Sequence, residues 1–273
     1  MSVADNKYKE LILDIYNNGT WDSDKEVRAK YADRTPAYCK SVFGKQVIFE
    51  PDELPLVTCK QMYPITALKE LYIIWIKQSN KVQDFKDINC NIWNEWELED
   101  GTIGKSYAYQ FQASDGRNQV KELLHNIVNN PASKRLMTSF WNYNDVQEKA
   151  LQECAWTTQW YTRRNYLDLM LIQRSADTGL GIPFNWFQYK ALQILVSKCT
   201  GYKPGRFIHQ MGCVHYYDRH EEDILKIIDL KEFEQPELIL DINKGTDFFS
   251  YNYNDFKLNN YQHGPSIPFE IAI

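Results

Sequence analysis

Apolar residues recur at helical spacing in several segments of the chain, and shorter apolar runs lie between them. In residues 7–18, Tyr8, Leu11, Ile12 and Ile15 fall on one helical face. The same spacing predicts helices from Pro64 to about Asn80, over residues 118–129, from Phe184 to Lys198 and around His215–Ile228. Short apolar runs predict strands at Gln46–Glu50, Leu136–Asn142, Ala155–Arg163, Tyr166–Arg174, Arg206–Cys213 and Glu237–Ile242. Helices and strands therefore interleave, which indicates an α+β (mixed α/β) fold.

The strands at 155–163 and 166–174 are separated only by Arg164-Asn165, which predicts a two-residue hairpin turn. Asn tolerates the positive φ that such a turn requires. An antiparallel hairpin favours a mixed sheet over a purely parallel one. Because no internal repeat and no Gly-, Ser- or Pro-rich linker divides the chain, we expect a single domain over residues 1–273.

The same hairpin gives one of the six cysteines a distinctive neighbour. With the turn at 164–165, Cys154 faces Ser175 and lies next to Arg174. A guanidinium stabilises a neighbouring thiolate, which is the setting of a nucleophilic cysteine. The alternative is a buried cysteine at a strand end near a surface arginine, and the pattern alone leaves both open.

Composition narrows the class of protein. The net charge is −5 (31 Lys and Arg, 36 Asp and Glu), which excludes a globally basic nucleic-acid surface but not a local basic pocket for a small anion. The longest apolar run, Leu71–Ile76, is far shorter than the ~18 residues of a membrane span, and no secretory signal is visible. The cysteines form no Cys-x-x-Cys pair and no zinc-ligand spacing. We therefore expect a cytoplasmic protein with reduced thiols, no cysteine zinc site and no membrane partner.

One motif is specific enough to indicate a family. Gln173-Arg174-Ser175-x-Asp177-x-x-Leu180-Gly181-x-Pro183-Phe184-Asn185 resembles the signature of thymidylate synthases that follows their active-site cysteine. Shorter matches occur in family order along nearly the whole chain: Asp33-Arg34-Thr35, Leu54-Pro55-Leu56-Val57-Thr58-x-Lys60, Asn91-Ile92-Trp93-x-Glu95-Trp96, Lys134-Arg135, Gly212-x-x-His215-x-Tyr217 and Ile271-Ala272-Ile273.

The resemblance implies a homodimer built on a twisted mixed sheet flanked by helices. It implies reductive methylation of dUMP to dTMP, with 5,10-methylenetetrahydrofolate as the donor of carbon and hydride and with no metal. Two alternatives stay open. One is a dUMP hydroxymethylase that uses the same folate with water in place of hydride, and the other is a non-catalytic nucleotide-binding or regulatory paralogue.

The resemblance also implies roles for individual residues. Cys154 would add to C6 of uracil, because C5 is a poor nucleophile until a thiolate has added at C6. The other implied catalytic residues are Glu70, Tyr107, Arg174, Asp177 and Asn185. The implied dUMP site comprises Arg34, Lys134, Arg135, Gln173, Arg174, Ser175, Asn185, His215 and Tyr217, with Lys134 and Arg135 reaching the phosphate held by the partner subunit. The implied folate site comprises Glu70, Ile92, Trp93, Trp96, Leu151, Asp177, Gly181, Phe184 and the C-terminal Ile273.

Several positions depart from the usual family pattern. Ala155 stands where His is common, Asn94 and Cys213 stand where Asp is usual, Ala108 replaces a Gly, and Lys134 replaces the first residue of an Arg pair. A Lys gives up the bidentate phosphate geometry of Arg. These departures leave the cysteine, the glutamate and Asn185 in place, so a divergent but active enzyme is expected.

Overall fold

A mixed sheet forms the centre of the computed structural model, which describes residues 2–273 of the chain; residue 1 of the expected domain lies outside them. In spatial order its strands are β1 (Thr20–Trp21), β2 (Cys39–Phe49), β6 (Lys203–Tyr217), β5 (Tyr166–Asp177), β4 (Ala155–Arg163) and β3 (Met137–Ser139). β5 and β6 run parallel and the other neighbouring pairs run antiparallel. A separate hairpin pairs β7 (Glu237–Leu240) with β8 (Phe256–Asn259). The predicted mixed sheet is confirmed.

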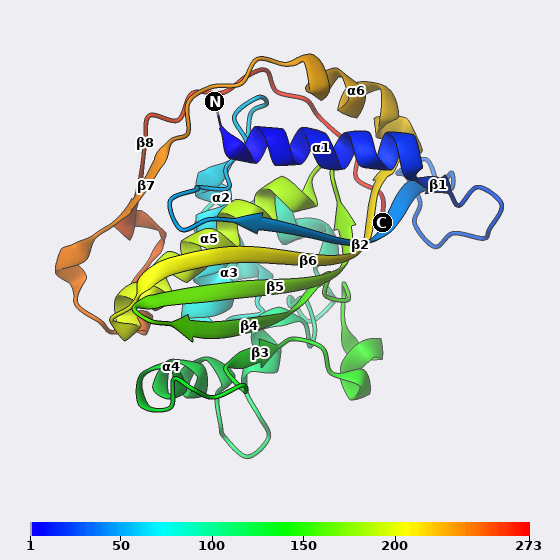
Figure 1. Ribbon diagram of the computed structural model, residues 1–273. Coiled ribbons are helices and arrows are strands. Elements are labelled where there is room, and N and C mark those ends of the chain that lie inside the picture. The colour runs from blue at the N-terminus through cyan, green and yellow to red at the C-terminus, as the bar shows by residue number, and fades with distance from the viewer. Residues whose placement is uncertain (1) are drawn as a thin grey trace.

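Helices cover one face of this sheet and leave the other open. They are α1 (Val3–Asn18), α2 (Pro64–Leu71), α3 (Val82–Lys86), α4 (Gln119–Asn129), α5 (Gly181–Thr200) and α6 (Glu221–Lys226). Figure 1 shows α2, α3 and α5 behind the sheet and α1 along its upper edge, while the face toward the viewer carries strands alone. α5 is buried over most of its length, and together with the covered face it forms the core.

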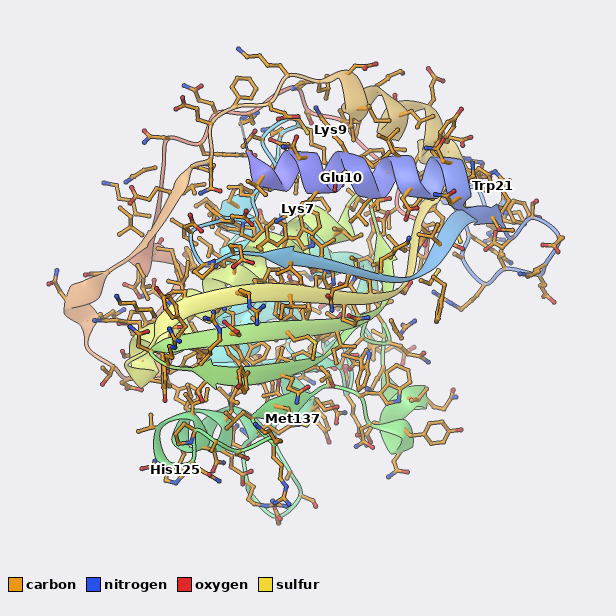
Figure 2. The ribbon with its side chains drawn as sticks, viewed as in Figure 1. Lys7, Lys9, Glu10, Trp21, His125 and Met137 are labelled. Atoms are coloured by element: carbon orange, nitrogen blue, oxygen red, sulfur yellow. The ribbon has the colours of Figure 1, made fainter. Side chains whose placement is uncertain are left out.

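Side chains from α1 tie this helix to the edge of the sheet. The ammonium of Lys7, labelled in Figure 2, donates to the carbonyl of Ile48 at 2.6 Å and to Glu53 at 2.8 Å. The apolar face of α1 (Tyr8, Ile12, Ile15) is completely buried, as the spacing predicts.

The helix expected around His215–Ile228 is wrong at its start. His215 to Tyr217 complete β6, and α6 begins only at Glu221. β6 extends this far because it is paired on both sides, with His215 opposite Ser41 of β2 and Asp177 of β5. Two-sided pairing satisfies the backbone groups that a helix would otherwise have satisfied.

Other boundaries differ by a few residues. β4 has the predicted bounds, whereas β2, β5 and β6 are longer and the strands expected at 136–142 and 237–242 are shorter. α5 begins at Gly181, before the expected Phe184, and the Asp177 carboxylate accepts the N–H groups of Gly179 and Leu180 just ahead of it. The helix from Pro64 continues through a π-helical stretch, Tyr72–Lys77, and ends there because Gln78 has a left-handed φ of 55°.

The β4–β5 hairpin contains the feature that places the cysteine. Its register follows the predicted turn from Arg163–Tyr166 to Thr157–Ile172, and a bulge then shifts it by one residue, so that Ala155 faces Gln173. The carbonyl of Cys154 accepts the backbone N–H of Arg174 at 2.9 Å. Cys154 therefore faces Arg174, and the expected pairing with Ser175 is wrong. In the turn, the positive φ (57°) lies at Arg164 and not at Asn165.

Candidate functional site

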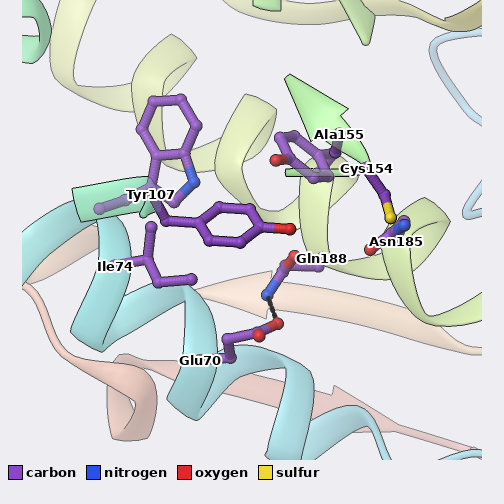
Figure 3. A pocket seen from close by; sticks show the side chains of 9 residues that line it. Glu70, Ile74, Tyr107, Cys154, Ala155, Asn185 and Gln188 are labelled. Atoms are coloured by element: carbon purple, nitrogen blue, oxygen red, sulfur yellow. Dashed lines mark hydrogen bonds between the residues drawn. The ribbon is translucent and has the colours of Figure 1, made fainter. Parts of the chain in front are cut away.

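Cys154 opens onto a small cavity between α2, α5 and the start of β4. The cavity has a volume of about 50 Å³ and is lined by Glu70, Ile74, Trp75, Tyr107, Cys154, Ala155, Asn185, Gln188 and Tyr189. Figure 3 shows the Cys154 sulfur beside the Asn185 amide, with Glu70 and Gln188 joined by a hydrogen bond across from them. The structure thus brings together four of the predicted residues: Cys154, Glu70, Tyr107 and Asn185.

Glu70 is a buried carboxyl that accepts hydrogen bonds on both oxygens. The indole of Trp93 donates to Oε1 at 2.7 Å, and the amide of Gln188 donates to Oε2. Burial raises the pKa of Glu70 to about 7, and the two donors oppose that rise. The carboxyl can therefore either hold or release a proton near neutral pH.

Tyr107 approaches the cysteine from a short 3₁₀ segment, Tyr107–Phe111. It has a left-handed φ of 43°, and its backbone N–H donates to Oε1 of Glu153 at 3.1 Å. Burial raises the pKa of Tyr107 well above its usual value, so its hydroxyl stays protonated. A tyrosine in a strained backbone conformation that is held by a carboxylate is fixed in position.

Arg174 holds the two backbone carbonyls that directly precede Cys154. Its Nε donates to the carbonyl of Glu153 and its Nη2 to that of Gln152, both at 2.9 Å. Burial raises the pKa of the Cys154 thiol, while the charges of Arg174 and Arg28 lower it. The net direction is upward, so the expected stabilisation of the thiolate by Arg174 is present but outweighed in this structure by desolvation.

A buried ion pair anchors the residue before the cysteine. The ammonium of Lys149 contacts both oxygens of Glu153, at 2.9 and 2.8 Å, and both side chains are completely buried. Lys149 also donates to the carbonyl of Phe140 at 3.2 Å. Glu153 therefore links the Cys154 segment to Tyr107 on one side and to Lys149 on the other.

Other residues expected to bind nucleotide lie along the neighbouring strand ends. Ser175 is opposite Cys213, and Asp177 is opposite His215, across the parallel β5–β6 pair. The rings of His215 and Tyr217 are 5.3 Å apart. This group lies on the same end of the sheet as Cys154.

The remaining predicted cations lie outside this group. Arg34 is exposed in the loop before β2. Lys134 and Arg135 are exposed before β3, beside Tyr161 at the far end of β4. At roughly 3.3 Å per strand residue, the seven steps from Cys154 to Tyr161 span about 23 Å, so the structure does not bring these two cations to the Cys154 of the same chain.

Aromatic side chains expected at the folate site form a cluster beside Glu70. The Trp93 ring is 5.8 Å from that of Trp96 and 5.4 Å from that of Tyr107. Leu151 and Phe184 are partly buried and pack against the hydrophobic core, and Ile92 is partly exposed. Gly181 begins α5, and Ile273 exchanges two backbone hydrogen bonds with Lys30, both at 2.9 Å.

The sequence reasoning missed several residues of this site: Arg28, Lys149, Glu153, Gln188 and His209. The spacing of Lys149 and Glu153 is typical of an exposed salt bridge, and Arg28 lies in a polar stretch without a motif. Gln188 gave one signal, because it falls one helical turn after Asn185. His209 gave none, since nothing local indicates that it contacts Gln173.

Within residues 2–273, no group of three or more His, Cys, Asp or Glu side chains could hold a metal ion. None of the helices in this range has the length and apolar character needed to cross a membrane.

Comparison with known proteins gives a consistent result. A family model described as thymidylate synthase matches residues 6–273. The chain is 40% identical to the thymidylate synthase of Bacillus subtilis subsp. natto and to that of Bacillus phage phi3T, in each case over 100% of both chains. The solved structure of a thermostable thymidylate synthase A from Bacillus subtilis has a TM-score of 0.94 and 40% identity, covering 98% of this chain and 99% of that one.

Proposed function

Because the chain belongs to the thymidylate synthase family, we propose that it methylates dUMP to dTMP with Cys154 as the nucleophile. 5,10-Methylenetetrahydrofolate, the co-substrate of the family, supplies both the carbon and the hydride when bound. The hydroxymethylase alternative is not favoured, since the full-length relatives are thymidylate synthases. The observation that carries the residue assignment is the cavity in which Cys154, Glu70, Tyr107 and Asn185 meet.

Cys154 would form a covalent bond from sulfur to C6 of uracil, which makes C5 nucleophilic. Burial opposes ionisation of this thiol, and the charges of Arg174 and Arg28 favour it. A nucleotide phosphate that binds Arg174 would compete for donors that now hold the carbonyls of Gln152 and Glu153. The Lys149–Glu153 pair would then keep the segment in place.

Glu70 and Tyr107 would handle the protons. A carboxyl with a pKa of about 7 can protonate O4 as the adduct forms and accept a proton later, directly or through the few waters that the cavity can hold. Tyr107 would assist removal of the C5 proton, with its hydroxyl kept neutral by burial.

The rest of the nucleotide would be held by side chains on the strand ends. Asn185 can accept from N3–H of uracil and donate to O4. His215 and Tyr217 would bind the sugar hydroxyl, and Ser175 and Arg34 would bind the phosphate. Gln173, which accepts from Asn185, supports the base-reading residue.

The residues present suit a folate. The adjacent rings of Trp93 and Trp96, which meet edge to face, would offer an aromatic surface to a pterin, and Leu151, Phe184 and Ile92 would add apolar contacts. The Asp177 carboxylate accepts two backbone N–H groups and retains lone pairs for a ring N–H. Ile273 and the segment before it would close over the ligand and exclude water.

A second copy of the chain would complete the site, since we infer a homodimer. Phe43 of β2 (85% exposed) and Tyr161 of β4 (50% exposed) are large apolar side chains suited to burial in an interface. Lys134 and Arg135 are too far from their own Cys154, and their exposed charges would reach the phosphate bound by the partner subunit.

We also infer one catalytic domain over residues 1–273 and a cytoplasmic location. The free state of all six cysteines in the described structure supports the cytoplasmic location.

The product of the purified protein tests this function. We expect dTMP when dUMP and methylenetetrahydrofolate are supplied, identified by chromatography with mass spectrometry. Cys154→Ser should lower the rate by at least about a thousandfold, whereas Cys199→Ser, a half-buried thiol near the end of α5, should leave it unchanged. Hydroxymethyl-dUMP as the main product, or a Cys154→Ser rate within tenfold of wild type, would contradict the proposal.

A further inference from the structure

Four side chains form a continuous line of hydrogen bonds behind the cavity. The indole Nε1 of Trp186 is 3.0 Å from Nδ1 of His209, and Nε2 of His209 is 3.0 Å from Oε1 of Gln173. The same oxygen is 3.0 Å from Nδ2 of Asn185. Trp186 and His209 are completely buried, and Gln173 is 2% exposed. Only Asn185 lines the cavity.

The donor and acceptor of every hydrogen bond in this line follow from the indole N–H of Trp186, at its buried end. An indole nitrogen can only donate, so Nδ1 of His209 must accept and the proton of a neutral ring lies on Nε2. Burial lowers the pKa of His209 to about 3, which keeps the ring neutral. Nε2–H must then meet an acceptor, so the oxygen of the Gln173 amide faces His209. The Gln173 Nε2 donates to the carbonyl of Ser175 at 2.8 Å, which holds the amide in the same orientation.

The last residue of the line is constrained in turn. Because Oε1 of Gln173 is an acceptor, Asn185 must direct its Nδ2 toward it. The second Nδ2 proton and Oδ1 of Asn185 then present a donor beside an acceptor, which matches O4 and N3–H of uracil. A flipped Asn185 would match cytosine, but it would place its oxygen against Oε1 of Gln173 with no proton between them.

We propose that Trp186 and His209 are specificity-determining residues, which act through Gln173 to fix the Asn185 amide in the orientation that accepts uracil and rejects cytosine. The inference rests on the proposed role of Asn185 in reading the base. Neither residue lines the cavity, so both act as positioning residues. Their effect is on the choice between dUMP and dCMP and not on the chemistry at Cys154.

The test compares the affinities of the full-length protein for dUMP and dCMP by titration calorimetry. His209→Phe keeps a buried ring but removes both bonds, and we expect the dCMP-to-dUMP ratio of dissociation constants to fall about tenfold. His209→Gln, which can still donate to Gln173, should restore most of the ratio. Trp186→Phe should lower the ratio, whereas Trp160→Phe, which loses a buried indole donor bound to Thr158, should not. An unchanged ratio in both His209→Phe and Trp186→Phe would overturn the proposal.

A second measurement does not depend on nucleotide binding. Nitrogen-15 NMR of histidine-labelled protein should show His209 as a neutral ring protonated on Nε2 at every pH from 5 to 8, with His209→Phe identifying its signal. A proton on Nδ1, or titration within this range, would disprove the line of bonds itself. If instead the NMR result holds and wild-type protein does not prefer dUMP over dCMP, the assigned role of Asn185 fails.

Discussion

Glu70 accepts hydrogen bonds from Trp93 and Gln188, both uncharged donors, and its pKa is about 7. Such donors stabilise the carboxylate, but by less than burial destabilises it. Because the folded-state pKa lies above 4.5, the unfolded chain loses this proton first as the pH rises. The contribution of Glu70 to stability is therefore lost between pH 4.5 and about 7.

Gln188→Met should move this titration upward. The loss of one donor to the carboxylate destabilises the charged form, so we expect the pKa of Glu70 to rise by about one unit. The corresponding limb of the pH–rate profile for dTMP formation should shift in the same direction.

The matched control is Gln193→Met on the same helix. Gln193 is also buried, but its amide donates to the carbonyls of Leu167 and Arg206 and not to a carboxylate. Its profile should keep the wild-type midpoint even if stability falls. A shift of equal size in both variants would show that the effect comes from α5 packing and not from Glu70.

At the scale of elements, the sequence pattern predicts the features of a helix or strand that depend on residues close to it in the chain. The bounds of β4 follow from its apolar run and from the turn at 164–165, and both are confirmed. The bulge between Ala155 and Thr157 does not follow, because it depends on how Cys154 meets Arg174 across the hairpin. It moves the cysteine by one position, and this decides which residue it faces.

The end of β6 shows the same limit. His215 to Tyr217 become strand because β2 pairs with all three residues and β5 also pairs with His215, and both strands are far from β6 in the sequence. In the site, motif similarity identified Cys154, Glu70, Tyr107 and Asn185, which share the cavity. It could not identify Lys149 and Glu153, since only the fold removes this pair from water.

The buried pair makes a stability prediction for the segment before β4. Lys149→Met leaves the Glu153 carboxylate buried without its cation, and we expect the free energy of unfolding to fall by about 3 kcal/mol. The double variant Lys149→Met/Glu153→Gln removes both charges and keeps an acceptor for Tyr107, so it should recover most of that loss. Urea denaturation measures both.

Lys105 provides the control in the same region. It pairs with Asp145 and Glu148 in a partly exposed position, so Lys105→Met should cost at most about 1 kcal/mol. If Lys149→Met costs no more than Lys105→Met, or if the double variant is as unstable as the single one, the pair does not anchor the segment as described.

At the scale of the whole molecule, an acidic chain gathers cations at two separated places. Arg174 and Arg28 act on Cys154, while Lys134 and Arg135 lie at the far end of the hairpin. The two groups can serve one phosphate only if they come from different subunits. We propose that the open face of the sheet is the surface on which a second copy brings them together.

The most direct test of a Cys154 site completed by a partner subunit is to mix two inactive variants. Cys154→Ser subunits and Lys134→Ala/Arg135→Ala subunits are combined in equal amounts, dissociated in urea and reassembled, with wild-type protein taken through the same cycle. Random reassembly makes half of the dimers mixed, and each mixed dimer has one intact site and one defective site. One quarter of all sites are then intact, so the rate of dTMP formation at low dUMP should reach about one quarter of the wild-type rate. A mixture no more active than the mean of its two parents would contradict the account.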